Sequence, residues 1–103
     1  SVSDSVIKST KIYYKNKSSI ETFVNQYNDI HAVLPSENEI KSAYKKLLDK
    51  SNELLKEQFS NTDEFYQKEY KDKKVTINLQ KIDKTLKMQK KIIRELQKLV
   101  EKG

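Results

Sequence analysis

The chain holds one glycine and one proline in 103 residues, and this scarcity restricts its folds more than any other feature of the sequence. Sandwiches and barrels need many tight turns, and phosphate-binding loops need several glycines. Leu, Ile, Val and Phe together supply 27 of the 103 residues. This share is larger than the ~20% below which highly charged sequences stay disordered. We therefore predict one small all-α domain made of long helices, because about 100 residues hold a single core.

A first helix is predicted over residues 18–34. Ser18 and Glu21 match the capping box, in which a Ser and a Glu three residues later satisfy free amides of the first turn. Pro35 ends this helix, because the residue before a proline is pushed out of the α region. Between these limits, apolar residues recur at steps of three and four, as they do on one face of a helix. They are Ile20, Phe23, Val24, Tyr27, Ile30 and Val33 or Leu34.

Residues 1–17 contain apolar side chains without a sustained period. We expect these residues to form a partly mobile lead-in segment, and residues 18–103 to form a single helical bundle domain. The chain begins without a Met, which favours a processed protein or a piece of a longer one. Any signal or anchor would then precede residue 1.

A second helix is predicted over residues 36–60. Ser36 and Glu39 repeat the capping box directly after the proline, so the connection is short and the two helices should be antiparallel. Residues 60–63 read Ser-Asn-Thr-Asp, and such side chains bond their own backbone and mark a break or a new helix start. We expect a short helical connector over residues 62–73.

The clearest pattern covers the last helix, which is predicted over residues 76–102. Apolar residues there alternate steps of four and three, the heptad pattern of packed helices, with Gln89 as the one polar member. A brief strand over residues 75–77 is the alternative start, but a lone strand has nothing to pair with. The fold class is therefore an all-α antiparallel bundle of three principal helices, elongated and coiled-coil-like, since the last helix would span ~40 Å. The heptad positions are Val75, Leu79, Ile82, Leu86, Gln89, Ile93, Leu96 and Val100.

Residues that could carry catalysis are few. The chain has no Cys, which excludes thiolate zinc sites, cysteine nucleophiles and disulfides. His31 is the single histidine, and a general-base role would need a Ser or carboxylate partner that no motif supplies. We interpret it as a partly exposed helix residue, and we expect no enzyme activity, no cofactor and no small-molecule substrate.

Three carboxylates, Asp49, Glu53 and Glu57, stand at four-residue steps and could bind a hard cation if another helix supplied more oxygens. No Glu-x-x-His pair accompanies them, so the di-iron arrangement is missing. We therefore expect no metal site and interpret these carboxylates as a solvated face among neighbouring lysines.

Basic charge gathers in the last helix, where residues 75–103 contain eight Lys and Arg residues against three acidic ones. A stripe of these residues lies opposite the apolar heptad positions and could follow nucleic-acid phosphates or anionic lipid head groups. We favour a solvated surface over both partners, because Arg94 is the only arginine and no aromatic residue is placed to stack on bases. The lysine stripe comprises Lys84, Lys87, Lys91, Arg94 and Lys98.

Ile92 and Leu99 widen the apolar face of the last helix beyond what one packing partner needs. We hypothesise that they and the lysine stripe form the interaction surface of a non-catalytic helical domain that binds another protein or itself. Such a domain could be the soluble exposed part of a surface or membrane-attached bacterial protein, and we favour this location over the cytoplasm. The alternative is a small basic cytoplasmic protein that binds nucleic acid or acts as a regulator through the lysine stripe.

Overall fold

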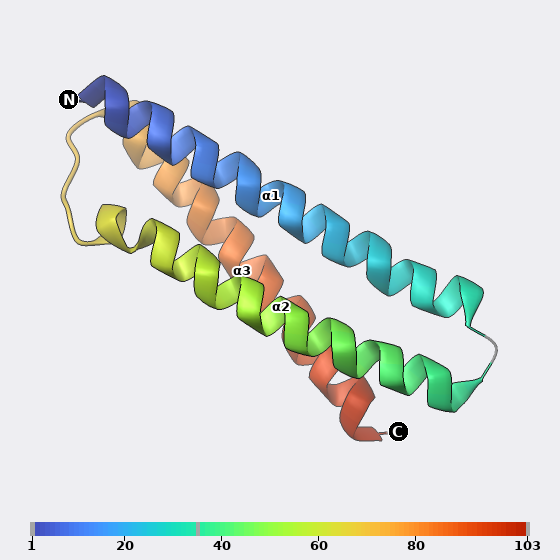
Figure 1. Ribbon diagram of the computed structural model, residues 1–103. Helices are drawn as coiled ribbons and strands as arrows, with labels where there is room; N and C mark the ends of the chain where they lie inside the picture. The colour runs from blue at the N-terminus through green and yellow to red at the C-terminus, as the bar shows by residue number, and fades with distance from the viewer. Residues whose placement is uncertain (1, 35, 103) are drawn as a thin grey trace.

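The computed structural model describes residues 2–34 and 36–102, with the side chains of residues 4–34 and 36–101. Three helices make up this part of the chain: α1 (Val2–Val33), α2 (Glu37–Tyr66) and α3 (Lys73–Lys102). Each helix packs against the other two, α2 runs antiparallel to both, and α1 and α3 run in the same direction (Figure 1). The bundle measures 53 × 21 × 16 Å. The predicted all-α three-helix bundle of elongated shape is confirmed.

The first helix begins at Val2, so the prediction of a lead-in segment over residues 1–17 and of a bundle that starts at residue 18 is wrong for the described residues. Ser18 lies inside α1 and does not cap it. Its backbone carbonyl accepts a hydrogen bond of 3.0 Å from the Thr22 hydroxyl, one turn further along the same helix. Ser1 lies outside the described residues.

Buried polar side chains explain why apolar periodicity does not predict the first half of α1. Ser9 and Asn16 are 0% and 1% exposed, and they continue the buried face of α1 toward its start from Ile20. Asn78 of α3 donates a hydrogen bond of 2.9 Å from its side-chain amide to the Ser9 hydroxyl. A search for apolar residues alone therefore finds this helix face only from Ile20 onward.

The start of α2 agrees with the prediction, because Ser36 is its N-cap. The backbone N–H of Glu39 donates to the Ser36 hydroxyl oxygen at 3.2 Å. Helix α1 ends at Val33, close to its predicted end. Pro35, to which that end was attributed, lies outside the described residues.

Replacing Ser36 with Ala should lower the free energy of unfolding by ~1 kcal/mol, because one amide of the first turn of α2 loses its partner. Thermal melts followed by circular dichroism measure this loss. The matched control is Ser18→Ala, which should melt no lower than the parent, because Ser18 is inside a helix and Ala is the better helix former. Coincident melts of Ser36→Ala and the parent would show that this cap contributes nothing.

The far end of α2 differs from the prediction. The helix continues to Tyr66, and the helical connector predicted over residues 62–73 is wrong, because residues 67–72 form a non-helical link. Thr62 and Phe65 are 0% and 1% exposed, so they belong to the core face of α2. The Thr62 hydroxyl donates to a carbonyl one turn earlier, which is compatible with a helix interior.

Helix α3 begins at Lys73, three residues before its predicted start, and no strand forms at residues 75–77. Asp72 caps the helix. One of its carboxylate oxygens accepts hydrogen bonds from the backbone N–H groups of Lys74 at 2.8 Å and of Val75 at 3.2 Å. A carboxylate at a helix start also interacts favourably with the helix dipole.

The heptad positions predicted for α3 lie in the core, as expected. Six of them are at most 4% exposed: Val75, Ile82, Leu86, Gln89, Ile93 and Leu96. An apolar cluster, formed by Phe23, Tyr44, Leu47 and Leu96, joins α3 to both other helices. Among the residues whose side chains the structure describes, six buried ones are polar: Ser9, Asn16, Ser51, Gln58, Thr62 and Gln89.

Three of these buried polar residues carry carboxamides, one from each helix. Asn16, Gln58 and Gln89 are 1%, 2% and 0% exposed. The side-chain nitrogen of Asn16 and both polar side-chain atoms of each glutamine have no hydrogen-bond partner among the described residues. We call these three residues the carboxamide layer.

Contacts between their chain neighbours place the three carboxamides at a similar level of the bundle. The residues that directly precede Asn16 and Gln58 form an ion pair at 3.3 Å. Phe59 directly follows Gln58, and Lys90 directly follows Gln89. The Lys90 ammonium nitrogen lies 4.5 Å from the centroid of the Phe59 ring. A buried polar group without a partner costs about 1–3 kcal/mol, so we expect the carboxamide layer to lower the stability of the bundle.

Candidate functional site

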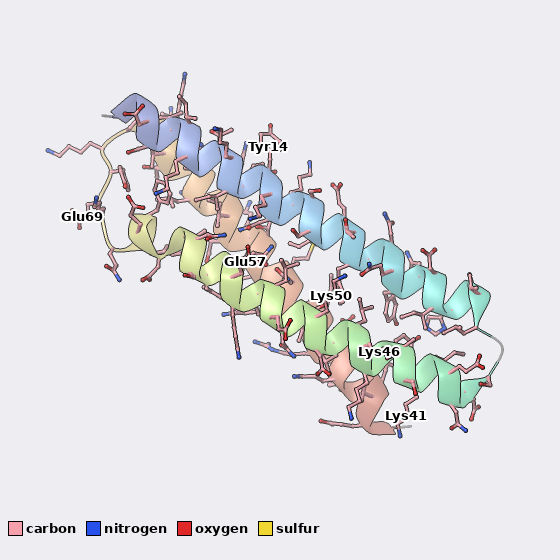
Figure 2. The ribbon with its side chains drawn as sticks, viewed as in Figure 1. Tyr14, Lys41, Lys46, Lys50, Glu57 and Glu69 are labelled. Carbon is pink, nitrogen blue, oxygen red and sulfur yellow. The ribbon has the colours of Figure 1, made fainter. Side chains whose placement is uncertain are left out.

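The side of α1 and α2 that faces away from α3 is not covered by any of the three described helices. In Figure 1, α3 lies behind the other two helices. Lys46 and Lys50 follow one another along α2 (Figure 2). A ligand could therefore reach this side of the bundle without displacing a helix.

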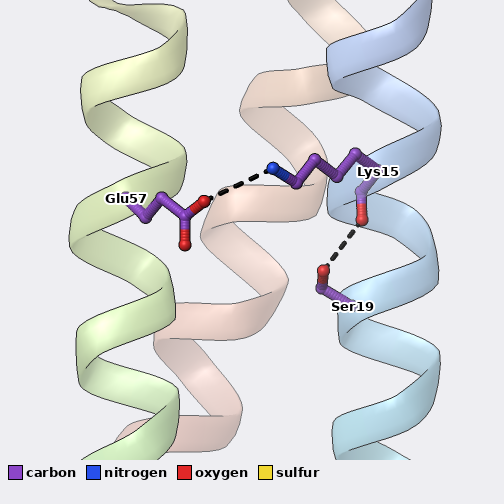
Figure 3. A network of polar contacts seen from close by, with 3 residues as sticks. All are labelled: Lys15, Ser19 and Glu57. Carbon is purple, nitrogen blue, oxygen red and sulfur yellow. Dashed lines mark hydrogen bonds and ion pairs between the residues drawn. The ribbon is translucent and has the colours of Figure 1, made fainter.

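Two ion pairs join α1 to α2 on this side. Lys15 reaches from α1 across the front of α3 to Glu57, with 3.3 Å between Nζ and Oε1 (Figure 3). Seven residues earlier in α1, Lys8 pairs with Glu64, and the hydrogen bond from Lys8 lowers the pKa of that carboxyl. The two pairs bridge the helices toward the end of the bundle where α2 is linked to α3.

Beyond these ion pairs, the surface between α1 and α2 contains two hollows with volumes of about 170 and about 370 Å³. Gln26, Leu47 and Lys50 line both of them, so the two hollows adjoin. Together we call them the α1/α2 groove. Its lining residues fall within residues 18–30 of α1 and residues 43–54 of α2.

The groove has an apolar floor and small side chains along its walls. Phe23 and Leu47 are 3% and 7% exposed and belong to the apolar cluster. Ser19, Thr22 and Ala43 line the walls. The distance at which two helices pack depends on the side chains between them, and these short side chains would allow a fourth helix to approach closely.

Basic residues predominate at the rim of the groove. Lys46 and Lys50 line it from α2 and are both exposed, and Asp29 lines it from α1. Neither lysine takes part in any ion pair found among the described residues. Asp49 and Glu53 stand three residues after the two lysines but do not pair with them in the described part of the chain. The rim therefore has an excess of positive charge.

His31 lies near the turn between α1 and α2, among aromatic rings. Its Nε2 shares a hydrogen bond with the Tyr44 hydroxyl, and Tyr27 stacks on Tyr44 with 5.6 Å between ring centroids. Burial raises the pKa of Tyr44, and the neighbouring Tyr27 adds to the shift, so the Tyr44 hydroxyl stays protonated at neutral pH. The sequence suggested no partner for His31, whereas the structure gives it a tyrosine that packs α1 against α2.

The two residues predicted to flank the core of α3 differ in their burial. Ile92 is half-buried, packs against the apolar cluster, and lines a separate hollow of about 210 Å³ between α1 and α3. Leu99 is 37% exposed. Of the two, Leu99 is therefore the more accessible to another molecule.

The lysine stripe lies on the exposed side of α3, and Lys87 within it pairs with Asp83 at 3.0 Å. None of its residues lines the α1/α2 groove. The stripe and the groove are thus separate surfaces. All five stripe residues are exposed: Lys84, Lys87, Lys91, Arg94 and Lys98.

The three carboxylates considered as cation ligands, Asp49, Glu53 and Glu57, are exposed, and Glu57 pairs with Lys15. In the part of the chain that the structure describes, no group of three or more His, Asp or Glu side chains is arranged to hold a metal ion. Within the same residues, every helix is too polar or too short to cross a membrane.

Comparison with known protein families, characterised proteins and solved structures gives no match for this chain. What it does must therefore be inferred from its own surfaces. Among these, the α1/α2 groove combines an apolar floor with rim lysines that form no ion pair within the described part of the chain.

Proposed function

We propose that this chain is a non-catalytic helical domain that binds another protein by holding one helix of that protein in the α1/α2 groove. The observation that carries the proposal is the pair of adjoining hollows with a floor of Phe23 and Leu47, on a side that no described helix covers. An amphipathic helix that lays its apolar face into such a groove is a recurring mode of recognition. The groove extends along residues 18–30 of α1, which corresponds to ~18 Å or about three helical turns.

The occupant that we propose is a helix of a different protein and not a second copy of this chain. The chain carries a net charge of +6, and the rim of the groove is itself basic at Lys46 and Lys50. Two copies that meet through this side would bring like charges together, which opposes association. A partner helix of lower charge avoids that repulsion.

A series of labelled peptides tests the proposal. Each peptide is an amphipathic helix of about 14 residues with leucines along one face, and binding is measured by fluorescence anisotropy. Ala43→Trp should fill the groove and raise the Kd by at least about tenfold, because Ala43 lines its wall. The matched control is Ala32→Trp, which changes an exposed residue of α1 outside the groove lining and should bind the peptides as the parent does.

Circular dichroism verifies that each variant folds, and Thr22→Trp on the opposite wall serves as a second blocking variant. Loss of binding in both groove variants, with the control unaffected, supports the proposal. Equal binding by the parent, both groove variants and the control would contradict it. A dimer in sedimentation that Ala43→Trp dissociates would replace the proposed partner with a second copy of the chain.

A further inference from the structure

We infer that the helix held in the α1/α2 groove is acidic, with two carboxylates about one turn apart that meet Lys46 and Lys50. This inference rests on the proposed function and adds the chemistry of the partner to it. The basis is the pattern of charged residues along the two helices. In one half of the α1/α2 face, that pattern pairs two lysines with glutamates. In the other half, Lys46 and Lys50 form no ion pair among the described residues.

The satisfied half contains the two ion pairs Lys8–Glu64 and Lys15–Glu57. The two lysines are seven residues apart on α1, and the two glutamates are seven residues apart on α2. Seven residues make about two helical turns, so positions with this spacing lie on nearly the same face. The same step therefore identifies which residues should meet next along the face.

The next position brings together Thr22 and Lys50, and here the series of ion pairs stops. Lys50 has no carboxylate opposite it on α1, and both residues line the smaller of the two hollows. The groove thus begins where the bundle no longer supplies a carboxylate of its own. A carboxylate from a partner helix would supply to Lys50 the opposite charge that the glutamates supply to the lysines of the earlier pairs.

Lys46 lies one turn from Lys50 on the same helix, and both line the larger hollow. Asp29, on the opposite rim, is the one carboxylate in the lining of this hollow, and it forms no ion pair with either lysine in the described structure. Four residues along a helix correspond to ~6 Å. Carboxylates at i and i+4, or at i and i+3, on a partner helix have a spacing that matches these lysines.

A set of three peptides tests the charge of the partner. All share the same leucine face and differ at two rim positions, which carry Glu, Gln or Lys. The acidic peptide should bind the parent about tenfold more tightly than the neutral one, and the basic peptide should bind most weakly. The preference should decrease between about 0.02 M and about 0.3 M NaCl, because salt screens exposed charges.

The variant Lys46→Glu, Lys50→Glu should reverse this order and favour the basic peptide. Its control is Lys68→Glu, Lys71→Glu, which makes the same change in net charge in the exposed link between α2 and α3, away from the groove. The control should keep the preference for the acidic peptide. An equal loss of preference in both variants would attribute it to the net charge of the chain and would overturn the inference.

Two other outcomes separate the inference from the proposed function. If the three peptides bind equally and Ala43→Trp still prevents binding, the groove accepts a helix but does not select acidic ones, and the inference alone fails. If no peptide binds the parent, the proposed function and the inference both fail.

Discussion

The variant Ile93→Asp should be unfolded at room temperature. Ile93 is 4% exposed and lies among the buried heptad positions of α3, so the substitution would place a carboxylate without a partner in the core. An unpaired buried charge costs several kcal/mol, which is comparable to the total stability of ~5–15 kcal/mol for a small domain. Circular dichroism should show loss of helical signal, or a melting temperature far below that of the parent.

Leu99→Asp is the matched control for this experiment, because Leu99 is on the same helix and 37% exposed. It should fold and melt close to the parent. A helical, monomeric Ile93→Asp protein would contradict the expectation. It would mean that α1 and α2 do not cover this part of α3 in solution.

Replacing two members of the carboxamide layer should stabilise the protein. In the double variant Gln58→Leu, Gln89→Leu, four buried polar atoms without partners are removed, and apolar side chains of similar volume take their place. Each such carboxamide costs about 1–3 kcal/mol, so the gain from replacing two should be about 2–6 kcal/mol. For a domain of this size, that gain raises the melting temperature by roughly 10 °C or more.

The control for the double variant is Gln97→Leu, which changes an exposed glutamine of α3 and should alter stability by less than about 0.5 kcal/mol. An unchanged or lower melting temperature of the double variant would contradict the prediction. It would show that the carboxamides satisfy one another or bind internal water in solution.

The parts of the fold that the sequence predicted are those in which apolar residues occupy the core positions. Helix α3 is the clearest case, because its one polar core residue, Gln89, interrupts the heptad pattern only once. In α1, Ser9 and Asn16 occupy core positions and conceal the helical period. These polar residues lie on the same buried face of α1 as the apolar residues that follow them. A search for apolar periodicity does not detect buried polar positions, so it does not predict this part of the helix.

The end of α2 shows the opposite effect, in which a local signal is overridden by packing. Residues 60–63 have the composition of a helix cap, yet they lie within α2. Thr62 and Phe65 bury their side chains in the core, and this burial outweighs the local preference for a break, as tertiary packing commonly does. Asp72, which caps α3, was missed because the predicted connector extended across it.

The candidate site was harder to predict than the fold. The sequence predicts an interaction surface at Ile92, Leu99 and the lysine stripe, because the last helix has the clearest apolar face and most of the basic charge. The α1/α2 groove depends on how two helices lie side by side, and its walls are small residues such as Thr22 and Ala43 that give no periodic signal. The sequence also gave no reason to separate Lys50 from other solvated lysines, because its lack of a facing carboxylate depends on the pairing of α1 with α2.

Backbone amide chemical shifts measured while the acidic peptide is added to the parent protein test the central claim most directly. If the partner helix binds in the α1/α2 groove, the largest changes should occur at Ser19, Thr22, Ala43 and Leu47, which line it. The exposed side of α3 should change little. Changes concentrated on the lysine stripe, between Lys84 and Lys98, with the groove residues unaffected, would contradict the account and would identify α3 as the interaction surface.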